Sequence, residues 1–260
     1  MKQIDERDVA KTSLQTALTS QSEGPFQKYK RMVSGQVSLP FFIWFELLTT
    51  LLCNFPGAAG FLLRKLFYPS LFQSVGHNVI FGKNMTIRHP KKIHLGNNII
   101  LDDNVVLDAK GENNQGITIG DGVMIARNTI IACKEGDISI GDNTNISSNC
   151  AFHSESKVSV GSNVLFAAYC YVVGGGRHNF DRIDIPIIQQ GSTSEGIAIG
   201  DNCWFGAHVC VLDGVTINND SIIAAGAIVK SNVPAYSIVG GVPAKIIKSR
   251  IEQKNPEEIQ

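Results

Sequence analysis

Aliphatic and aromatic residues recur every six positions between residues 75 and 234, and this period dominates the hydrophobic pattern of the chain. The repeats come in groups of three, with steps of six inside each group and a longer step only after the third member. The apolar positions are Val75, Phe81, Ile87, Leu95, Leu101, Leu107, Ile119, Ile125, Ile131, Ile140, Ile146, Phe152, Val160, Phe166, Val172, Ile199, Phe205, Val211, Ile217, Ile223 and Val229. A fixed short period sustained over this length is typical of a solenoid.

The positions between the apolar residues follow a pattern of their own. The next residue is usually small, the third is repeatedly Asn or Gly, and the fourth is small or β-branched. Asn and Gly tolerate the positive φ that a tight corner requires. Each hexapeptide is therefore predicted to be a short flat strand plus a corner, with the apolar residue and the fourth residue after it pointing inward. Three hexapeptides form one triangular coil, and stacking of coils buries the faces that no single repeat can bury.

The longest step between repeats covers residues 172–199 and carries His178, the best candidate for a chemical role. The glycines at 174–176 allow a sharp backbone turn before the histidine, and Pro186 and Gly191 disfavour regular structure after it. A loop of this length in a compact domain is usually functional or disordered. Because every insertion follows the third repeat, the insertions line one edge of the predicted prism, which often marks a binding face.

Composition divides the chain into a polar lead-in at 1–35, an apolar extension at 36–74, the repeat domain at 75–234 and a tail at 235–260. The lead-in lacks apolar periodicity, which predicts a flexible or weakly helical segment.

The apolar extension contains two apolar runs, within residues 37–72, that are separated by Pro56-Gly57. The first run includes Glu46 and is shorter than the about 20 residues of a bilayer span. The pattern therefore predicts two short helices. Two roles stay open for them: they cap the open end of the repeat domain, or they lie on a membrane surface with Arg64 and Lys65 at the lipid headgroups.

Charge and cysteine content narrow the class of protein. Of 260 residues, 23 are basic and 23 acidic, so the formal net charge is zero and gives no bulk electrostatic case for nucleic-acid binding. The six cysteines lack zinc-type or disulfide-type spacing. The polar, acidic start of the chain differs from a secretory signal. We expect a cytoplasmic protein, with the inner face of the membrane as the alternative location.

Four motifs carry a family resemblance: the His178 loop, Gly200-Asp-Asn-Cys-Trp-Phe-Gly-Ala207, Ile223-Ala-Ala-Gly-Ala-Ile-Val229 and Gly241-Val-Pro-Ala-Lys-Ile-Ile-Lys248. With them, residues 75–250 resemble the hexapeptide-repeat acyltransferases, closest to the galactoside, maltose and polysaccharide O-acetyltransferase branch. The resemblance implies an all-β fold, a left-handed parallel β-helix, here with a short N-terminal helical extension. It also implies acyl-CoA as co-substrate, no metal, and a homotrimer with active sites between neighbouring subunits.

The resemblance assigns roles to particular residues. It makes His178 the general base, since an imidazole can accept a proton near neutral pH. It places the backbone N–H of Ala207 toward the thioester carbonyl and Ala225 beside the pantetheine arm. It implies that Lys245 and Lys248 bind the nucleotide phosphates.

Three features depart from the family pattern or extend it. The family often has Thr-Lys after the penultimate coil, where this chain has Lys230-Ser231. Asn149 is one position away from a family asparagine that holds the acceptor, so it is either an acceptor ligand or a corner residue. Asp181 is a candidate for orienting His178, or is simply exposed.

The repeat pattern also predicts the positions of three cysteines and of Trp204. Cys150, Cys170 and Cys203 occupy the inward small position and are expected to fill the core. Trp204 should point outward, where it walls the donor site or packs on a neighbouring subunit.

The predicted function is transfer of an acetyl or other short acyl group from acyl-CoA to a hydroxyl of a sugar or polysaccharide unit. N-acylation of an amino sugar is the alternative, because the same base serves an amine. Two further alternatives are a non-catalytic binding module and a zinc enzyme of the carbonic anhydrase kind. His89 and His94 are closely spaced, but a third histidine on a neighbouring coil is missing. The sequence names neither the acceptor nor the acyl chain length.

Overall fold

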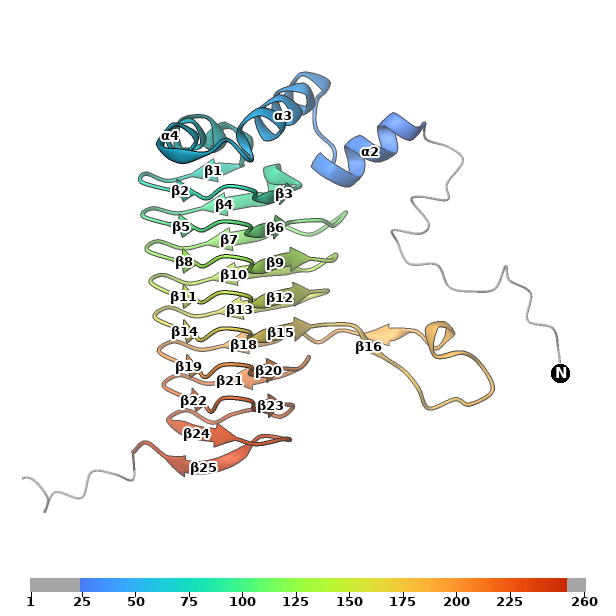
Figure 1. Cartoon of the computed structure of the whole chain (residues 1–260). Coiled ribbons are helices and arrows are strands. Elements are labelled where there is room, and N and C mark those ends of the chain that lie inside the picture. Colours follow the sequence, from blue (N-terminus) through green and yellow to red (C-terminus); the bar gives the residue numbers. More distant parts are fainter. Residues whose placement is uncertain (1–23, 252–260) are drawn as a thin grey trace, which may run out of the picture.

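The computed structural model describes residues 24–251, which form a stack of coils with helices at its N-terminal end (Figure 1). The helices are α2 (Pro25–Ser34), α3 (Leu39–Leu52) and α4 (Gly57–Phe67). Three faces of short strands follow, which we name sheets A, B and C in the order in which the chain enters them.

Sheet A consists of β1 (Ser74–Val75), β4 (Ile93–Leu95), β7 (Ile117–Ile119), β10 (Asp137–Ile140), β13 (Lys157–Val160), β18 (Ile197–Ile199) and β21 (Thr216–Ile217). Sheet B consists of β2 (Ile80–Phe81), β5 (Ile100–Leu101), β8 (Met124–Ile125), β11 (Asn145–Ile146), β14 (Leu165–Phe166), β19 (Trp204–Phe205), β22 (Ile222–Ile223), β24 (Ser237–Gly240) and β25 (Lys245–Ser249). Sheet C consists of β3 (Thr86–Arg88), β6 (Val106–Asp108), β9 (Ile130–Cys133), β12 (Ala151–Ser154), β15 (Tyr171–Gly174), β20 (Cys210–Val211) and β23 (Ile228–Val229).

Neighbouring strands within each sheet are parallel and come from successive coils, so equivalent repeat positions stack on each other. Phe152 of β12, for example, is in register with Val172 of β15. The one antiparallel neighbour in the three sheets is β25, which folds back on β24. The predicted parallel β-solenoid is therefore confirmed. Its last turn extends past residue 234, because β24 continues sheet B beside β22.

The core lies inside the prism and is built from the two inward positions of each repeat. Phe166 stacks on Phe205 of the next coil, with ring centroids 4.3 Å apart. Cys150, Cys170 and Cys203 are buried at the fourth positions, as expected for core-filling residues. Burial raises the pKa of the Cys203 thiol, which favours the neutral form that suits this environment.

The corner between sheets B and C contains a ladder of asparagines with positive φ. The amide of Asn84 donates to Asn104 (2.7 Å), Asn104 donates to Asn128 (3.0 Å), and Asn128 donates to Asn149 (3.1 Å). Their φ angles are 57°, 60°, 61° and 61°. The asparagine that the sequence places at corners therefore supplies both the left-handed backbone and a side-chain bond between coils.

The N-terminal helices close the first coil, as the capping interpretation predicts. Helix α3 ends before the Pro56-Gly57 break, and Gly57 has a φ of 67°. Arg64 of α4 is buried and donates to the carbonyls of Leu52 (3.1 Å), Phe55 (2.9 Å) and, on the first coil, Phe81 (3.1 Å). The guanidinium thus satisfies carbonyls at the end of α3 and joins the helices to sheet B.

Helix α2 lies inside the segment predicted to be a polar lead-in, and residues 1–23 of that segment are outside the described residues. Among residues 24–251, no single helix has the length and apolar content to cross a membrane, although α2 and α3, bent by 68°, pass this test as a pair.

Candidate functional site

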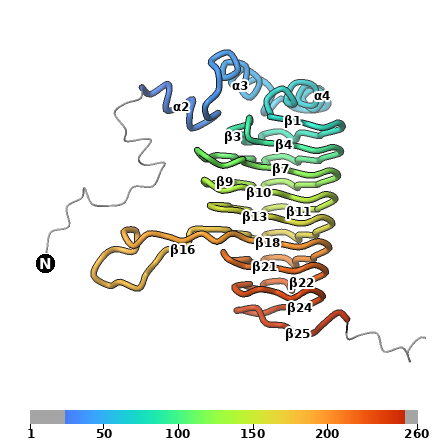
Figure 2. The backbone as a smooth tube through the Cα atoms, turned by 180° about the vertical axis from the view of Figure 1, so that it is seen from behind, coloured from blue at the N-terminus to red at the C-terminus, as the bar shows by residue number. Residues whose placement is uncertain are grey.

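The predicted catalytic loop leaves sheet C after β15 and returns to sheet A at β18, and it projects from the side of the prism (Figures 1 and 2). Its base is a short hairpin in which β16 (Arg177–His178) pairs antiparallel with β17 (Ser192–Thr193). His178 lies opposite Ser192 in this hairpin and is exposed. The loop therefore holds the imidazole on a hydrogen-bonded backbone while leaving its ring accessible.

Glycine is required where the loop begins. Gly175 has a φ of 139°, and a Cβ there would lie 2.4 Å from the Cβ of Glu155. Gly176 has a φ of 74°. Both conformations are unfavourable for other residues. The glycines thus allow the chain to leave the coil and enter the hairpin, as the sequence predicted.

The remainder of the loop is held by polar contacts that do not involve the histidine ring. The amide side chain of Asn179 donates to the carbonyl of Gln190 (3.0 Å), and Arg182 forms an ion pair with Asp184. Within residues 24–251, no hydrogen bond or ion pair joins Asp181 to His178, and Asp181 is exposed. The role of Asp181 as an orienting carboxylate stays a prediction without a contact to support it.

The predicted donor-site residues Ala207 and Ala225 are neighbours at the corner between sheets B and C. The carbonyl of Ala207 accepts from the N–H of Gly226 (2.8 Å). A Cβ at Gly206 would lie 2.5 Å from the backbone nitrogen of Ala225, so the two coils approach closely here. The N–H of Ala207 has no acceptor among the described residues. It is therefore available to a ligand, as are the equivalent groups of Ala168 and Ala225 on adjacent coils.

The predicted phosphate-binding residues lie at the C-terminal end of the prism. Lys245 and Lys248 are exposed on β25, opposite Gly240 and Ile238 of β24. Lys230, which follows β23, is also exposed. The end of the solenoid thus presents three ammonium groups on its last two turns.

His178 and Ala207 occupy different corners of the prism. Ala207 precedes strand β20 of sheet C, whereas His178 follows strand β15. Because Tyr171 of β15 is in register with Cys210 of β20, the two residues lie at opposite edges of the same sheet. The predicted base and the predicted oxyanion donor therefore leave sheet C from opposite ends of its strands.

Two residues at the corner that contains Ala207 depart from the repeat pattern and were not singled out in the sequence. Tyr169 and His208 have φ angles of 64° and 60°, in the column that Asn149 occupies one coil earlier. Their rings stack, with centroids 4.9 Å apart and an interplanar angle of 3°. Left-handed conformations are uncommon for such residues and are often found at functional sites. The available signal was the interruption of the Asn/Gly pattern at these two positions.

Two other candidates have clear structural settings. Asn149 is a member of the corner ladder, and its side-chain oxygen already accepts from Asn128, which supports the corner interpretation. Trp204 points outward from sheet B and is 52% exposed, as predicted.

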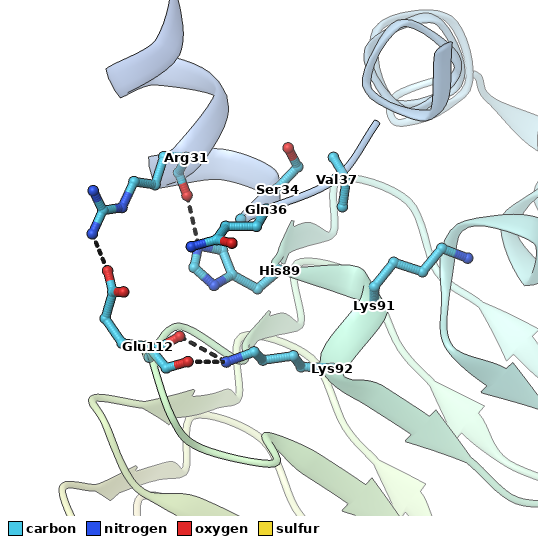
Figure 3. A pocket seen from close by; sticks show the side chains of 10 residues that line it. Arg31, Ser34, Gln36, Val37, His89, Lys91, Lys92 and Glu112 are labelled. Carbon is cyan, nitrogen blue, oxygen red and sulfur yellow. Dashed lines mark hydrogen bonds and ion pairs between the residues drawn. The ribbon is translucent and has the colours of Figure 1, made fainter. Parts of the chain in front are cut away.

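A pocket of about 300 Å³ lies between α2 and the first coils (Figure 3). The His178 loop leaves the prism several coils further along (Figure 1). The charged groups of the pocket are occupied by each other and by backbone. Arg31 forms an ion pair with Glu112, and Lys92 donates to the carbonyl of Gly111 (2.7 Å) and to Asn114 (2.8 Å). The Arg31 contact attaches α2 to the prism and the Lys92 contacts hold a loop of the prism, so we assign the pocket a structural role.

The two histidines of the zinc alternative are separately engaged. The Nε2 of His89 lies 2.9 Å from the carbonyl of Arg31, and the Nδ1 of His94 lies 2.9 Å from the hydroxyl of Ser74. Burial lowers the pKa of His89, because it disfavours the charged imidazolium. Residues 24–251 contain no group of three or more metal-binding side chains, so the zinc alternative finds no ligand set there.

Two segments of the chain match family models of hexapeptide repeats. Residues 196–231 match the bacterial transferase hexapeptide (six repeats), and residues 74–109 match the hexapeptide repeat of succinyl-transferase. Both segments lie in the solenoid, one including the Ala207 corner and the other the first two coils. These two segments of the chain thus carry hexapeptide repeats.

Its curated relatives include proteins named as acetyltransferases. A probable acetyltransferase of Mycobacterium tuberculosis is 33% identical over 134 residues, which are 52% of this chain and 44% of the relative. A putative lipopolysaccharide biosynthesis O-acetyl transferase of Escherichia coli is 29% identical over 119 residues, which are 44% of this chain and 61% of the relative. The chain thus spans roughly half the length of these curated relatives.

A solved structure resembles the chain over most of its length. It is a mutant of AntD, an N-acyltransferase from Bacillus cereus, in complex with dTDP and coenzyme A. The match has a TM-score of 0.52 and 21% sequence identity, and it covers 78% of this chain and 93% of that chain. This likeness shows a shared fold.

Proposed function

We propose that the protein is an acyl-CoA-dependent acyltransferase that moves an acetyl or other short acyl group to a hydroxyl of a saccharide. The observation that carries this proposal is the exposed imidazole of His178 on the long loop of a hexapeptide-repeat solenoid. Relatives named as acetyltransferases support the transfer of an acetyl group. The relative named for lipopolysaccharide biosynthesis supports a saccharide acceptor.

Each predicted site residue has a separate role in the proposed reaction. His178 accepts the proton of the acceptor hydroxyl as its oxygen attacks the thioester carbon. The unpartnered N–H of Ala207 donates to the oxyanion that forms. The coenzyme A thiolate then leaves as the tetrahedral intermediate collapses. Lys245, Lys248 and Lys230 bind the nucleotide phosphates of the donor at the end of the prism.

The test is a thiol-release assay with acetyl-CoA against sugars, sugar nucleotides, amino sugars and glycolipids. Release that depends on a hydroxylated acceptor supports the proposal. Release only with amino sugars favours the alternative N-acyltransferase, the activity for which AntD is named. Coenzyme A binding without transfer to any acceptor leaves a binding module, and absence of both contradicts the proposal.

We further propose a homotrimer, because the two halves of the site lie at opposite edges of sheet C. The outward residues of sheet B suit a subunit contact, since Ile100, Met124 and Leu165 are between 37% and 51% exposed. Those of sheet A, such as Thr118 and Ser159, are polar. Closed cyclic assembly lets each His178 loop reach the Ala207 corner of a neighbour.

Light scattering at micromolar concentration should give three times the mass of one chain. A fully active monomer would contradict the shared site, because a single chain would then contain the complete site.

A further inference from the structure

Helices α3 and α4 and the link between them expose several large apolar side chains, which together we call the end face. Its members are between 43% and 71% exposed. They are Leu39, Ile43, Leu47, Leu51, Phe55, Leu62 and Leu66. A helix that is apolar all round is normally buried, and a large exposed apolar patch usually marks an interaction site.

Helical geometry places these side chains on the side away from the prism. Leu39, Ile43, Leu47 and Leu51 are spaced by four residues, so they share one side of α3. The buried residues of α3, including Phe45, lie on the other side.

The same division holds in α4. Leu62 and Leu66 each lie two residues from Arg64, which places them on the opposite side of the helix. Arg64 faces the first coil, where it bonds the carbonyl of Phe81. Both helices lie across the end of the solenoid (Figures 1 and 2), so the end face points outward from that end.

The charge around the end face is positive. Residues 24–72 contain one acidic residue, Glu46, and five basic residues, of which Arg64 is buried and Arg31 forms an ion pair with Glu112. The carboxylate of Glu46 already accepts from the hydroxyl of Tyr29 (3.2 Å). Lys65 is exposed and lies on α4 next to Leu66. An apolar surface with cationic neighbours matches an anionic lipid surface, where the apolar groups enter the interface and the ammonium groups meet phosphate.

Trp44 adds an anchor of the kind found at membrane interfaces. It is 37% exposed, and its indole N–H donates to the hydroxyl of Ser70 (2.9 Å). A ring with an apolar body and a satisfied polar group suits the boundary between lipid and water.

We propose that the end face docks on the surface of an anionic lipid bilayer. A second copy of the chain is a poorer occupant, because residues 24–72 offer Lys65 only one acidic residue, Glu46, which already accepts from Tyr29. In this orientation the N-terminal end of the solenoid contacts the bilayer and the later coils extend away from it. The His178 loop leaves the fifth strand of sheet C, so it lies about 20 Å above the first coil at about 4.8 Å per strand.

The test is flotation of the full-length protein with vesicles of phosphatidylcholine, with and without phosphatidylglycerol. The wild-type protein should float with the anionic vesicles. The double variant Ile43→Glu/Leu47→Glu should lower the partition coefficient at least about tenfold, because it places two charges in the apolar interface. Lys65→Glu should lower it about fivefold or more on anionic vesicles and little on neutral ones.

The matched control is Ile246→Glu, which changes an aliphatic residue that is 60% exposed at the opposite end of the prism. It should float like the wild-type protein. If the double variant loses its native circular dichroism, the single Ile43→Glu variant is judged by the same criterion. The proposal is overturned if the wild-type protein stays unbound or the end-face variants float normally. The proposal is also overturned if the end-face variants dissociate an oligomer in the absence of vesicles. That result would show that a second copy of the chain covers the end face.

Discussion

The variant His178→Ala should lower kcat by about 10²–10⁴-fold while leaving the fold and coenzyme A affinity nearly unchanged. An acceptor hydroxyl is a weak nucleophile at neutral pH, so its proton must leave as it attacks the thioester. The imidazole is exposed, and the hairpin is held through backbone pairing with Ser192. Alanine keeps that pairing and removes the base. Steady-state kinetics with saturating acetyl-CoA measure the loss.

The control for this variant is Ile183→Ala on the same loop. Ile183 is fully exposed, so its truncation perturbs the loop without removing a titrating group. It should retain most of the wild-type kcat. A His178→Ala variant that keeps more than roughly a third of kcat would remove this residue from the mechanism, since loss of a general base should cost far more.

The repeat made the fold predictable because the core of a solenoid consists of contacts between neighbouring coils. Each inward residue contacts its equivalents on the next coils, as Phe166 contacts Phe205, so the period of the sequence is also the period of the packing. The corners followed from Asn and Gly for the same reason. The loop boundaries followed from the places where the period is interrupted.

The role of the N-terminal helices could not be decided from sequence, because α3 is apolar on all sides. The structure shows that one side closes the first coil and the other is exposed, so capping leaves a second surface free. Arg64 illustrates the limit. An arginine in an apolar run suggested a headgroup contact, yet it is buried against carbonyls of Leu52, Phe55 and Phe81. Those partners depend on how α4 turns after the Pro56-Gly57 break.

The candidate site was predicted as separate residues, and its division between two edges of sheet C emerged only in three dimensions. Sequence order places His178 before Ala207 but does not say that a whole face separates them. Tyr169 and His208 were not predicted because only the positions that match the Asn/Gly pattern were considered. Their stacked rings occupy corner positions where Asn or Gly would cost less strain.

The variant Ala207→Pro should lower kcat by about 10²–10³-fold, because it removes one hydrogen-bond donor to the oxyanion. We expect the corner to accept the proline. Only the third residue of this turn, His208, has positive φ, and a type II turn of this kind favours proline at the second position. The lost N–H has no acceptor among the described residues, so no bond between coils is broken. Ser148→Pro makes the same change two coils away and should keep both stability and most activity.

Mixing the two inactive variants tests where the site is assembled. In a trimer that pairs His178 of one chain with Ala207 of its neighbour, a chain carrying Ala207→Pro still supplies the base, and a chain carrying His178→Ala still supplies the donor. Equal co-expression should therefore restore about a quarter of the wild-type sites by random assembly around the axis. Because each chain lacks one group, a site contained within a single chain would regain nothing. Activity measured on the purified mixed trimers distinguishes the two arrangements, and failure to restore it while each variant remains trimeric would place both groups in the same chain's site or remove Ala207 from the reaction.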